Sequence, residues 1–225
     1  MMRSLMFREK SISGPWPGNI GIPQFSCSLM TVVVISLIFS RTVLGQKDYL
    51  FENVTVNEGL SNDEIYYFLQ DAHGLMWIST LDGLNRYDGY NIRIFKNDPS
   101  DSLSIPSDIV DAMVEDSTGG LWISCYGNII AHYDPRDDSF RRYPIERRGI
   151  TNMSDFTSAL NDSKGNIWFA STNHGIQKLD PSEQQFRYVS LDSTNSTTRW
   201  GEAYNIQELR NGNIITSDYS NGIKI

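Results

Sequence analysis

The chain has few of the residues that build disulfide frameworks and metal sites. Its 225 residues include two cysteines and three histidines. Cys27 falls in a segment that we expect to be removed, so Cys125 would have no partner, and neither a disulfide framework nor a cysteine metal cluster is expected. His73, His132 and His174 are far apart and match no HxxxH or HExxH spacing. We therefore predict no metal site and no cofactor.

Further absences narrow the class of protein. No segment shows a 3.6-residue apolar period, which argues against an α-solenoid. No GxSxG elbow, P-loop or GxGxxG stands between a strand and a helix, so we predict no catalytic residues and a chain that is not itself an enzyme. Carboxylates are numerous but generic, and their number alone does not exclude a glycosidase. The net charge of −8 disfavours nucleic acid and anionic membranes as partners and is compatible with neutral sugars or peptides.

A long apolar segment is also missing. The apolar run Leu29–Phe39 is shorter than the about 20 residues of a membrane-spanning helix, but it suits the apolar region of a signal peptide, about 7–15 residues. Arg3, Arg8 and Lys10 precede it, and Val43-Leu44-Gly45 offers small to medium residues for cleavage. We therefore predict an atypical signal peptide with a long basic start over residues 1–45, and an exported region over 46–225. A buried strand or a short anchor is the alternative.

What the chain does contain is a unit that recurs about every 45 residues. Its core reads DAHGLMWIST, then DSTGGLWISC, then DSKGNIWFAST, and in a worn fourth copy RNGNIITSD. Trp77, Trp122 and Trp168 fix the register at spacings of 45 and 46 residues, and Ile215 takes the tryptophan position of the fourth copy. Turn residues and a tryptophan at fixed offsets in such a period indicate a repeat architecture.

Each unit predicts four short antiparallel strands. The first precedes the aspartate and is rich in β-branched and aromatic residues, the second carries the tryptophan, the third ends in a large residue plus aspartate, and the fourth centres on phenylalanine. The predicted first strands are Ile65–Leu69, Ile109–Val114, Phe156–Leu160 and Tyr204–Leu209. Four strands per unit is the pattern of a propeller blade. We predict an all-β chain of about three and a half β-propeller blades in an incomplete ring, with blade cores near residues 65–95, 109–143, 156–189 and 204–225.

Three positions in each unit are predicted to have structural roles. The aspartate should bond backbone amides at the start of a type I turn, the glycine should adopt positive φ, and the tryptophan should pack neighbouring blades. These repeat positions are Asp71, Gly74 and Trp77; Asp116, Gly119 and Trp122; and Asp162, Gly165 and Trp168. Calcium binding by the aspartates, which needs a denser acidic loop, and sugar stacking on the tryptophans are the alternatives. Ligand-binding residues stay unknown at this level.

The segment Phe51–Phe95 resembles the opening blade of the two-component regulator propellers. The resemblance rests on GLSND at Gly59–Asp63, on the DxxGxxWxxT turn and strand, and on GLNRYDG at Gly83–Gly89, and it extends to about Ile225. Cys125 stands where the family usually has threonine, and the fourth copy lacks its tryptophan. The resemblance implies the periplasmic sensor region of a hybrid two-component system, which binds a ligand, expected to be a glycan fragment, and signals to a histidine kinase.

The resemblance also implies partners outside this chain. It predicts an oligosaccharide ligand, further propeller blades, a membrane-linked kinase and a dimeric full-length sensor, with no nucleic acid. Residues Asn221–Ile225 match the start of a third strand, so we expect an N-terminal fragment of a longer protein.

Two functions of other classes stay open. One is a secreted propeller enzyme acting on glycans, because the aspartate turns also resemble those of sialidases, and the other is a non-catalytic interaction scaffold. Sialidases need an arginine cluster, but the basic run Arg141, Arg142, Arg147 and Arg148 lies on one strand edge and the loop after it. That run is either a solvated loop edge or an anion-binding rim.

Overall fold

The computed structural model describes residues 51–145, 156–172, 175–190, 203–218 and 222–225. Regular structure in these residues consists of one 3-10 turn, η1 (Val56–Glu58), and β-strands. The described residues contain no helix that is long and apolar enough to cross a membrane. The predicted signal peptide over residues 1–45 lies outside the described residues.

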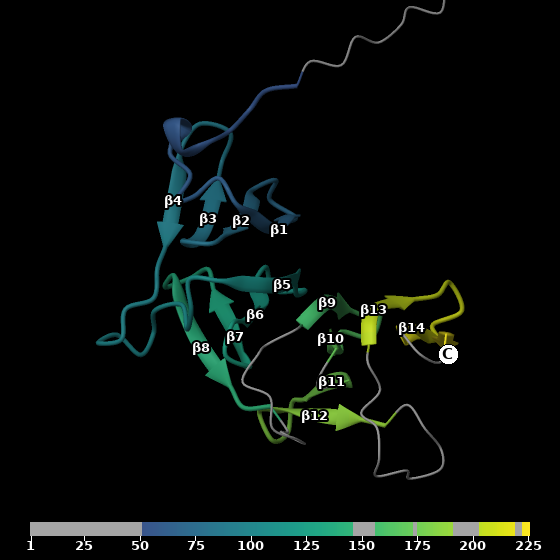
Figure 1. Ribbon diagram of the computed structural model, residues 1–225. Helices are drawn as coiled ribbons and strands as arrows, with labels where there is room; N and C mark the ends of the chain where they lie inside the picture. The colour runs from purple at the N-terminus through teal and green to yellow at the C-terminus, as the bar shows by residue number, and fades with distance from the viewer. Residues whose placement is uncertain (1–50, 146–155, 173–174, 191–202, 219–221) are drawn as a thin grey trace, which may run out of the picture. The chain divides into compact units, whose positions relative to one another are not determined.

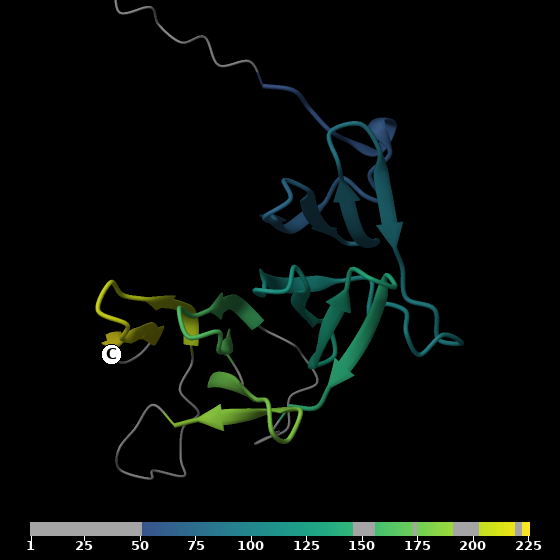
Figure 2. The same cartoon turned by 180° about the vertical axis from the view of Figure 1, so that it is seen from behind.

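The strands are short and follow one another in a regular order along the chain (Figures 1 and 2). They are β1 (Ile65–Gln70), β2 (Met76–Thr80), β3 (Gly83–Tyr87), β4 (Ile92–Phe95), β5 (Val110–Glu115), β6 (Leu121–Cys125), β7 (Ile129–Asp134), β8 (Ser139–Tyr143), β9 (Phe156–Asn161), β10 (Ile167–Ser171), β11 (Gly175–Asp180), β12 (Gln185–Val189), β13 (Ala203–Glu208), β14 (Ile214–Asp218) and β15 (Gly222–Lys224).

These strands form four separate antiparallel sheets. The first sheet is β1–β4, the second β5–β8 and the third β9–β12, each with its strands in chain order, and the fourth contains β13–β15. The sheets do not close into a ring within the described residues. The predicted all-β architecture of four-stranded blades, with a partial blade at the end, is confirmed.

Strand boundaries differ from the prediction by one residue in places. The fourth unit's first strand is β13, which ends at Glu208 rather than at Leu209. Leu209 begins the following turn, where its N–H bonds to the carbonyl of Asn213 at 2.8 Å. Its apolar side chain suits a strand, but its backbone belongs to the turn.

Each first strand contains a β-bulge near its start, which the sequence analysis missed. The pairing register skips one residue between Ile65 and Tyr67, between Val110 and Ala112, and between Ala203 and Asn205, and a matching shift occurs where β9 meets Ser171. The residues skipped in these four strands are Tyr66, Asp111, Thr157 and Tyr204. A bulge leaves its extra residue outside the ladder and re-aims that side chain.

The hydrophobic cores lie between consecutive sheets. The first strand of each sheet contacts the first strand of the next. In the first core, Trp77 and Leu84 of the first sheet pack with Met113, Ile123 and Phe140 of the second. The second and third cores contain Trp122, Ile130, Phe156, Phe169 and Phe186, and Ala170, Ile176, Ala203 and Ile206. An aromatic ring buried in this way removes about 150–250 Å² from water, which stabilises the stack by about 4–6 kcal/mol.

Polar side chains also connect one sheet to the next. Glu208, the last residue of β13, accepts hydrogen bonds from the N–H (2.7 Å) and the Oγ–H (2.5 Å) of Ser163 in the third sheet. Glu115, at the same place in β5, accepts the N–H of Ala72 at 2.8 Å. Asn161 takes this position in β9 and donates instead to the carbonyl of Glu115. In the second, third and fourth sheets, the last residue of the first strand therefore connects its own sheet to the preceding one.

We predict that Glu208→Ala lowers the free energy of unfolding by about 0.5–1.5 kcal/mol, because it removes the acceptor of two inter-sheet hydrogen bonds. Urea unfolding followed by circular dichroism measures the change. Glu64→Ala is the control, since Glu64 is exposed and directly precedes β1. Equal losses in the two variants would contradict an inter-sheet role for Glu208.

Candidate functional site

In the first three units, the turn between the first and the second strand is closed by the carboxylate of an aspartate. In the first unit, Asp71 Oδ1 accepts the backbone N–H groups of His73 at 3.0 Å and Leu75 at 2.9 Å. Asp71 Oδ2 accepts the indole Nε1–H of Trp77 at 2.9 Å. Gly74 has a φ of +86°, a conformation that favours glycine. One carboxylate thus satisfies donors in the turn and in the core.

The second and third units repeat this geometry. Asp116 Oδ2 accepts from Trp122 Nε1 at 3.0 Å, and Asp162 Oδ2 accepts from Trp168 Nε1 at 2.9 Å. In both, Oδ1 accepts the amides two and four residues further on. The glycines Gly119 and Gly165 have φ values of +80° and +78°. The structure therefore brings the nine repeat positions together three at a time, one set in each of the first three sheets, and not into a single site.

In the fourth unit, the turn forms although both the aspartate and the tryptophan are replaced. Leu209 replaces the aspartate and Ile215 replaces the tryptophan six residues later. The turn still forms, because Gly212 keeps a φ of +81° and its N–H bonds to the carbonyl of Leu209 at 2.8 Å. The backbone can therefore turn without the carboxylate, and the carboxylate and the indole are absent together.

The hydrogen bonds hold two of these carboxylates in the ionised form. Burial alone would raise the pKa of Asp116, but hydrogen bonds from His132 and Thr118 outweigh it and hold that pKa well below its usual range. His132 Nε2 lies 2.8 Å from Asp116 Oδ2. Burial is likewise outweighed at Asp162, where hydrogen bonds from Trp168 and Asn166 lower the pKa. Such carboxylates are bound acceptors and are poor candidates for general acids.

The tryptophans lie between the sheets. Trp77 is 2% exposed and Trp122 is 6% exposed, so neither can stack a sugar ring, and that alternative does not apply to them. Trp77 contacts Tyr133 of the next sheet at a ring separation of 4.9 Å. Trp122 contacts Phe186 of the next sheet at 5.7 Å. Trp168 is only partly buried, with the Lys178 ammonium 4.8 Å from the centre of its ring.

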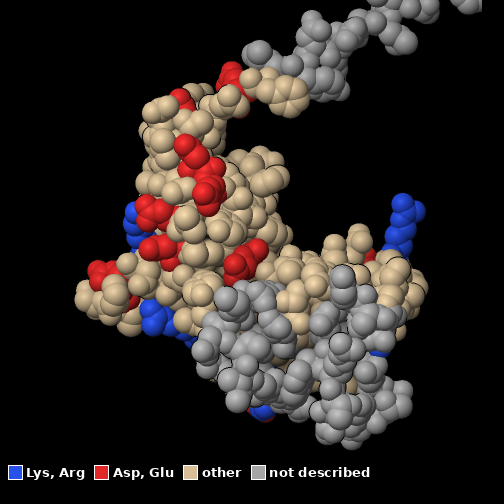
Figure 3. Space-filling model, in the orientation of Figure 1, with Lys and Arg blue, Asp and Glu red and all other residues tan. Residues whose placement is uncertain are grey.

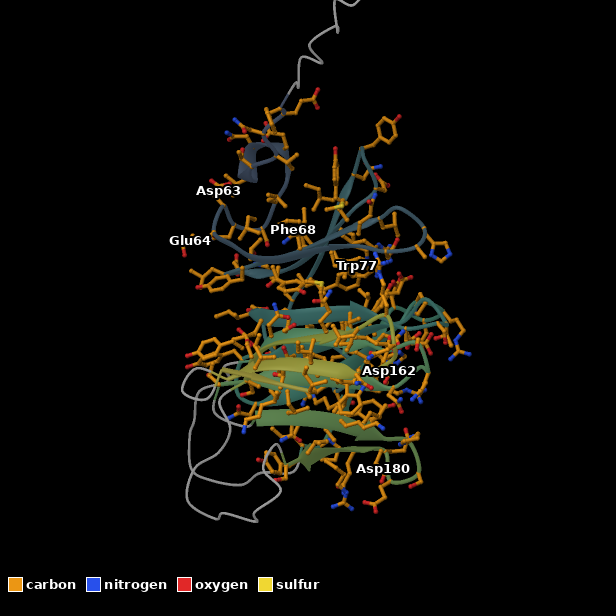
Figure 4. The ribbon with its side chains drawn as sticks, turned by 90° about the vertical axis from the view of Figure 1, so that its right-hand side faces the viewer. Asp63, Glu64, Phe68, Trp77, Asp162 and Asp180 are labelled. Atoms are coloured by element: carbon orange, nitrogen blue, oxygen red, sulfur yellow. The ribbon has the colours of Figure 1, made fainter. Side chains whose placement is uncertain are left out.

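The two ends of the strands carry different chemistry. Figure 4 places Asp162 and Asp180 at one end, which we call the aspartate-turn end, and Asp63 and Glu64 at the other, which we call the strand-start end. The first strands begin at the strand-start end, so the bulges lie there. At the strand-start end, acidic side chains gather over the first two sheets (Figure 3). The negative charge of this surface repels polyanions.

Exposed tyrosines also lie at the strand-start end. Tyr66 and Tyr204 are the bulge residues of β1 and β13, and they are 52% and 42% exposed. Tyr126 directly follows β6, is 48% exposed, and its N–H bonds to the carbonyl of Ile109, just before β5. Aromatic rings with a polar tip suit ligands that have both apolar faces and hydroxyl groups. We take this end as the candidate ligand-facing surface.

A charged cluster joins the first two sheets. Arg86 donates to the hydroxyl of Tyr133 at 2.8 Å and lies 3.3 Å from Asp138, which also pairs with Arg93. Burial and the hydrogen bond to Asp138 raise the pKa of Tyr133. Because Asp138 already pairs with both guanidinium groups, part of their charge is compensated within the protein, which makes them weaker candidates for binding an anionic substrate.

Among the described residues, the remaining sequence candidates do not converge on a reaction centre. Cys125 is fully buried, and burial raises the pKa of its thiol, as expected for a small core residue. Arg141 and Arg142 are exposed on β8. Arg147, Arg148 and His174 lie outside the described residues. Within the described part of the chain, no group of three or more His, Cys, Asp or Glu side chains is arranged to hold a metal ion.

Three kinds of contact escaped the sequence analysis. Nothing in the sequence indicates that His132 pairs with Asp116, because the histidine occurs in one unit only. The residues that pair with the tryptophan in the other two units are Arg86 and Lys178. The connection through Glu115 and Glu208 could have been found from the polar residue that precedes each turn. The tryptophan acceptor could also have been found, because the spacing of six from aspartate to tryptophan occurs three times and both residues are lost together.

We predict that Asp162→Leu and Trp168→Ile, the pair present in the fourth unit, are not additive. Asp162→Leu alone leaves a partly buried indole N–H and two turn amides without an acceptor, which costs about 1–3 kcal/mol. In the double variant the indole is gone, so the combined loss should be smaller than the sum by about 1 kcal/mol. Urea unfolding of the four proteins measures the coupling. Additivity within about 0.5 kcal/mol would mean that the tryptophan acts by packing alone.

The lowered pKa values predict a loss of stability in acid. A carboxyl whose folded pKa is depressed contributes its full stability above its unfolded pKa of about 4, and that stability is lost as the pH falls towards the folded value. Asp162→Asn should therefore weaken the fall in unfolding free energy between about pH 5 and pH 2. Glu52→Gln, at an exposed position, is the control. If the free energy of unfolding of Asp162→Asn depended on pH as that of the unchanged protein does, the lowered pKa assigned to Asp162 would be wrong.

Comparison with known proteins agrees with this repeat structure. The family model described as the two component regulator propeller matches residues 59–82 and 104–127, which cover the aspartate turns of the first two units. The chain is similar to Histidine kinase P4 of Formosa agariphila, with 37% identity over 87 residues, which are 39% of this chain and 6% of that protein.

Solved structures agree on the fold. The chain resembles an extracellular domain assigned to a hybrid two component system of B. thetaiotaomicron, with a TM-score of 0.65 and 22% identity over 78% of this chain and 25% of that one. It also resembles a catalytically inactive virginiamycin B lyase of Staphylococcus aureus, solved with quinupristin, with a TM-score of 0.54 and 15% identity over 81% and 56% of the two chains. The chain thus spans about a quarter of the solved sensor domain. The resemblance predicted from GLSND, the aspartate turn and GLNRYDG is confirmed, because the two-component regulator propeller model matches the first two units of the chain.

Proposed function

We propose that this chain is part of the exported, ligand-sensing propeller of a hybrid two-component sensor. One observation carries the proposal: the repeats that match the two-component regulator propeller model fold into consecutive antiparallel sheets similar to an extracellular sensor domain. In this proposal the chain performs no reaction itself. Ligand binding is transmitted to a histidine kinase elsewhere in a longer, dimeric protein, and the similarity to Histidine kinase P4 supports that link.

The ligand in this proposal is a glycan fragment that binds at the strand-start end. The glycan class follows from the resemblance to the sensor family. The exposed rings of Tyr66, Tyr126 and Tyr204 support it, because a sugar presents apolar faces that stack on aromatic rings and hydroxyl groups that hydrogen-bond beside them. The acidic side chains at this end favour neutral over polyanionic glycans.

Further blades of the same protein are proposed to cover the first sheet. Phe68 of β1 is 67% exposed, whereas Met113, at the same position relative to its aspartate turn, is 1% exposed because the first sheet covers it. A blade packed on the first sheet would bury Phe68 in the same way. An exposed aromatic residue at a repeat core position supports the presence of more blades in the intact sensor.

The rival function is an enzyme acting on glycans. A propeller with a similar fold is a lyase, so the fold alone does not decide between the two. The carboxylates of the aspartate turns disfavour catalysis, because each is already bonded to amides and an indole. A turnover assay on the candidate oligosaccharides separates the two functions.

We predict that Tyr66→Ala and Tyr204→Ala each weaken oligosaccharide binding by about 5-fold or more, since stacking on an aromatic ring contributes about 1 kcal/mol. Tyr90→Ala is the matched control, because Tyr90 is 93% exposed but lies in the turn between β3 and β4 at the aspartate-turn end. Calorimetric titration of the intact sensor with neutral and acidic oligosaccharides measures the affinity.

Two results would overturn the proposed function. Hydrolysis or elimination of the oligosaccharide by the protein would make it an enzyme. Equal effects of Tyr66→Ala and Tyr90→Ala would remove the strand-start end as the ligand surface. Ligand-dependent phosphorylation of the intact sensor that is lost in Tyr66→Ala and kept in Tyr90→Ala is the expected outcome.

A further inference from the structure

The exposed arginines of β8 have no role in the proposed function, and the sequence leaves them open as a solvated edge or an anion-binding rim. Arg141 and Arg142 are neighbours on this strand, and both are exposed. Arg142 pairs with Ala131, which belongs to the core shared with the first sheet. Arg141 pairs with His132. Successive residues of a strand lie on opposite faces of its sheet, so the two guanidinium groups face different neighbouring sheets.

Each of the first three sheets carries a row of two basic side chains beside its tryptophan. A basic residue of the third strand pairs with the tryptophan, and an arginine of the fourth strand pairs with that basic residue. Residues that pair directly across antiparallel strands lie on one face, with Cβ atoms about 4.5–5.5 Å apart. The rows are Trp77, Arg86 and Arg93; Trp122, His132 and Arg141; and Trp168, Lys178 and Arg187.

In the first row, the second sheet supplies the counterion. Asp138 Oδ1 lies 3.3 Å from Arg86 Nη1, and Asp138 Oδ2 lies 2.5 Å from Arg93 Nη1. The side chain of Asp138 is 31% exposed, so the carboxylate binds the two arginines at the surface of the sheet contact. The first contact thus shows that a basic row at this position binds a carboxylate.

The third sheet has an uncharged residue at the position of this counterion. Gln184 directly precedes β12 as Asp138 directly precedes β8, and the two residues have φ values of +53° and +57°. The side-chain amide of Gln184 donates to the carbonyl of Pro181 at 2.8 Å. The N–H of Phe186 bonds to the carbonyl of Pro144 at 2.8 Å, so β12 begins next to the end of β8. The second contact therefore has the basic row without the carboxylate.

Arg141 forms no ion pair with any described residue. Two acidic side chains of these sheets are already bonded elsewhere. Asp116 Oδ2 lies 2.8 Å from Nε2 of His132, and Glu183 pairs with Arg187 of its own sheet. The positive charge of Arg141 is therefore available to a ligand at the surface of this contact.

We propose that Arg141, at the outer end of the contact between the second and third sheets, binds the carboxylate of a small acidic ligand. The carboxylate takes the place that Asp138 has in the first contact. A guanidinium presents parallel N–H groups that match the two oxygens of a carboxylate, so it recognises the ligand by geometry as well as by charge. Leu179 stands where the first contact has Tyr133, so the site lacks that hydroxyl and binding depends on Arg141.

This site is separate from the candidate ligand-facing surface. Gln184 lies in the turn that follows Asp180, and Figure 4 places Asp180 at the aspartate-turn end. The acidic side chains that repel anions gather at the strand-start end (Figure 3). The proposal therefore does not rest on the proposed function, and either one can fail without the other.

Glucuronate is the probe, and glucose, which has the same type of ring without the charge, is the control ligand. The full chain is labelled with ¹⁵N-arginine, and the Nε–H resonance of Arg141 is identified by its loss in Arg141→Gln. At constant ionic strength, glucuronate should shift this resonance in a saturable way, with half-saturation at about 10 mM. Glucose should leave it in place. A weaker shift with acetate assigns the site to sugar acids, and an equal shift assigns it to small carboxylates in general.

Two variants test the position of the site. Arg142→Gln is the matched control, because it removes the same charge one residue away on the other face of β8, and it should change the half-saturation at Arg141 by less than ~2-fold. Asp138→Gln gives the first contact the residue type of Gln184. The resonance of Arg93 should then respond to glucuronate, which it does not do in the unchanged chain.

Three results would overturn the proposal. The first is the absence of a saturable shift at Arg141, or an equal shift with glucose. The second is loss of the Arg141 response in Arg142→Gln, because binding would then follow net charge and not this position. The third is an Arg93 resonance that stays unresponsive in Asp138→Gln while circular dichroism shows a folded protein, because the two contacts would then not be equivalent.

Discussion

The hydrogen bond from each tryptophan indole to the carboxylate six residues before it joins the turn to the core. A tryptophan that is buried between two sheets carries an N–H that must find an acceptor, and leaving it without one costs about 1–3 kcal/mol. The strand carbonyls around it are used in the sheet ladder, so a side chain has to supply the acceptor. Asp71, Asp116 and Asp162 do so at 2.9–3.0 Å while they also close their turns. Turn geometry and core packing are therefore not independent in this repeat.

The stability of each sheet depends on the adjacent sheet. Each core is made by two sheets, so a single sheet has an apolar face that only a neighbour can cover, as in other stacked repeats. The exposure of equivalent residues follows the neighbours and not the residue type: Met113 is buried and Phe68 is exposed, although both are apolar and occupy the same repeat position. Residues such as Glu208, which reaches Ser163 in the preceding sheet, add polar contacts to this stacking.

Periodicity made most of the fold predictable. The tryptophan spacing and the turn residues predict the repeat, the strand number and the family. They can do so because they recur, and aligning the copies shows which positions are shared. Contacts between units were not predictable in this way. His132 reaches Asp116 only because Gly120 leaves room for its ring, and Glu115 reaches Ala72 across a sheet contact whose geometry no local pattern encodes. The bulges escaped as well, since a bulge changes pairing without changing the alternation of residue types.

The bulges have a consequence for where function can reside. At the aspartate-turn end, three units repeat the same aspartate, glycine and tryptophan, because the coupling of turn and core ties the aspartate and the tryptophan to each other. At the strand-start end, the equivalent bulge positions hold Tyr66, Asp111, Thr157 and Tyr204. A bulge residue lies outside the ladder, so its side chain can vary without disturbing the pairing on either side. Variation at bulge positions on one end of repeated units is what a recognition surface on a repeat scaffold requires, and the exposed rings of Tyr66 and Tyr204 lie at such positions.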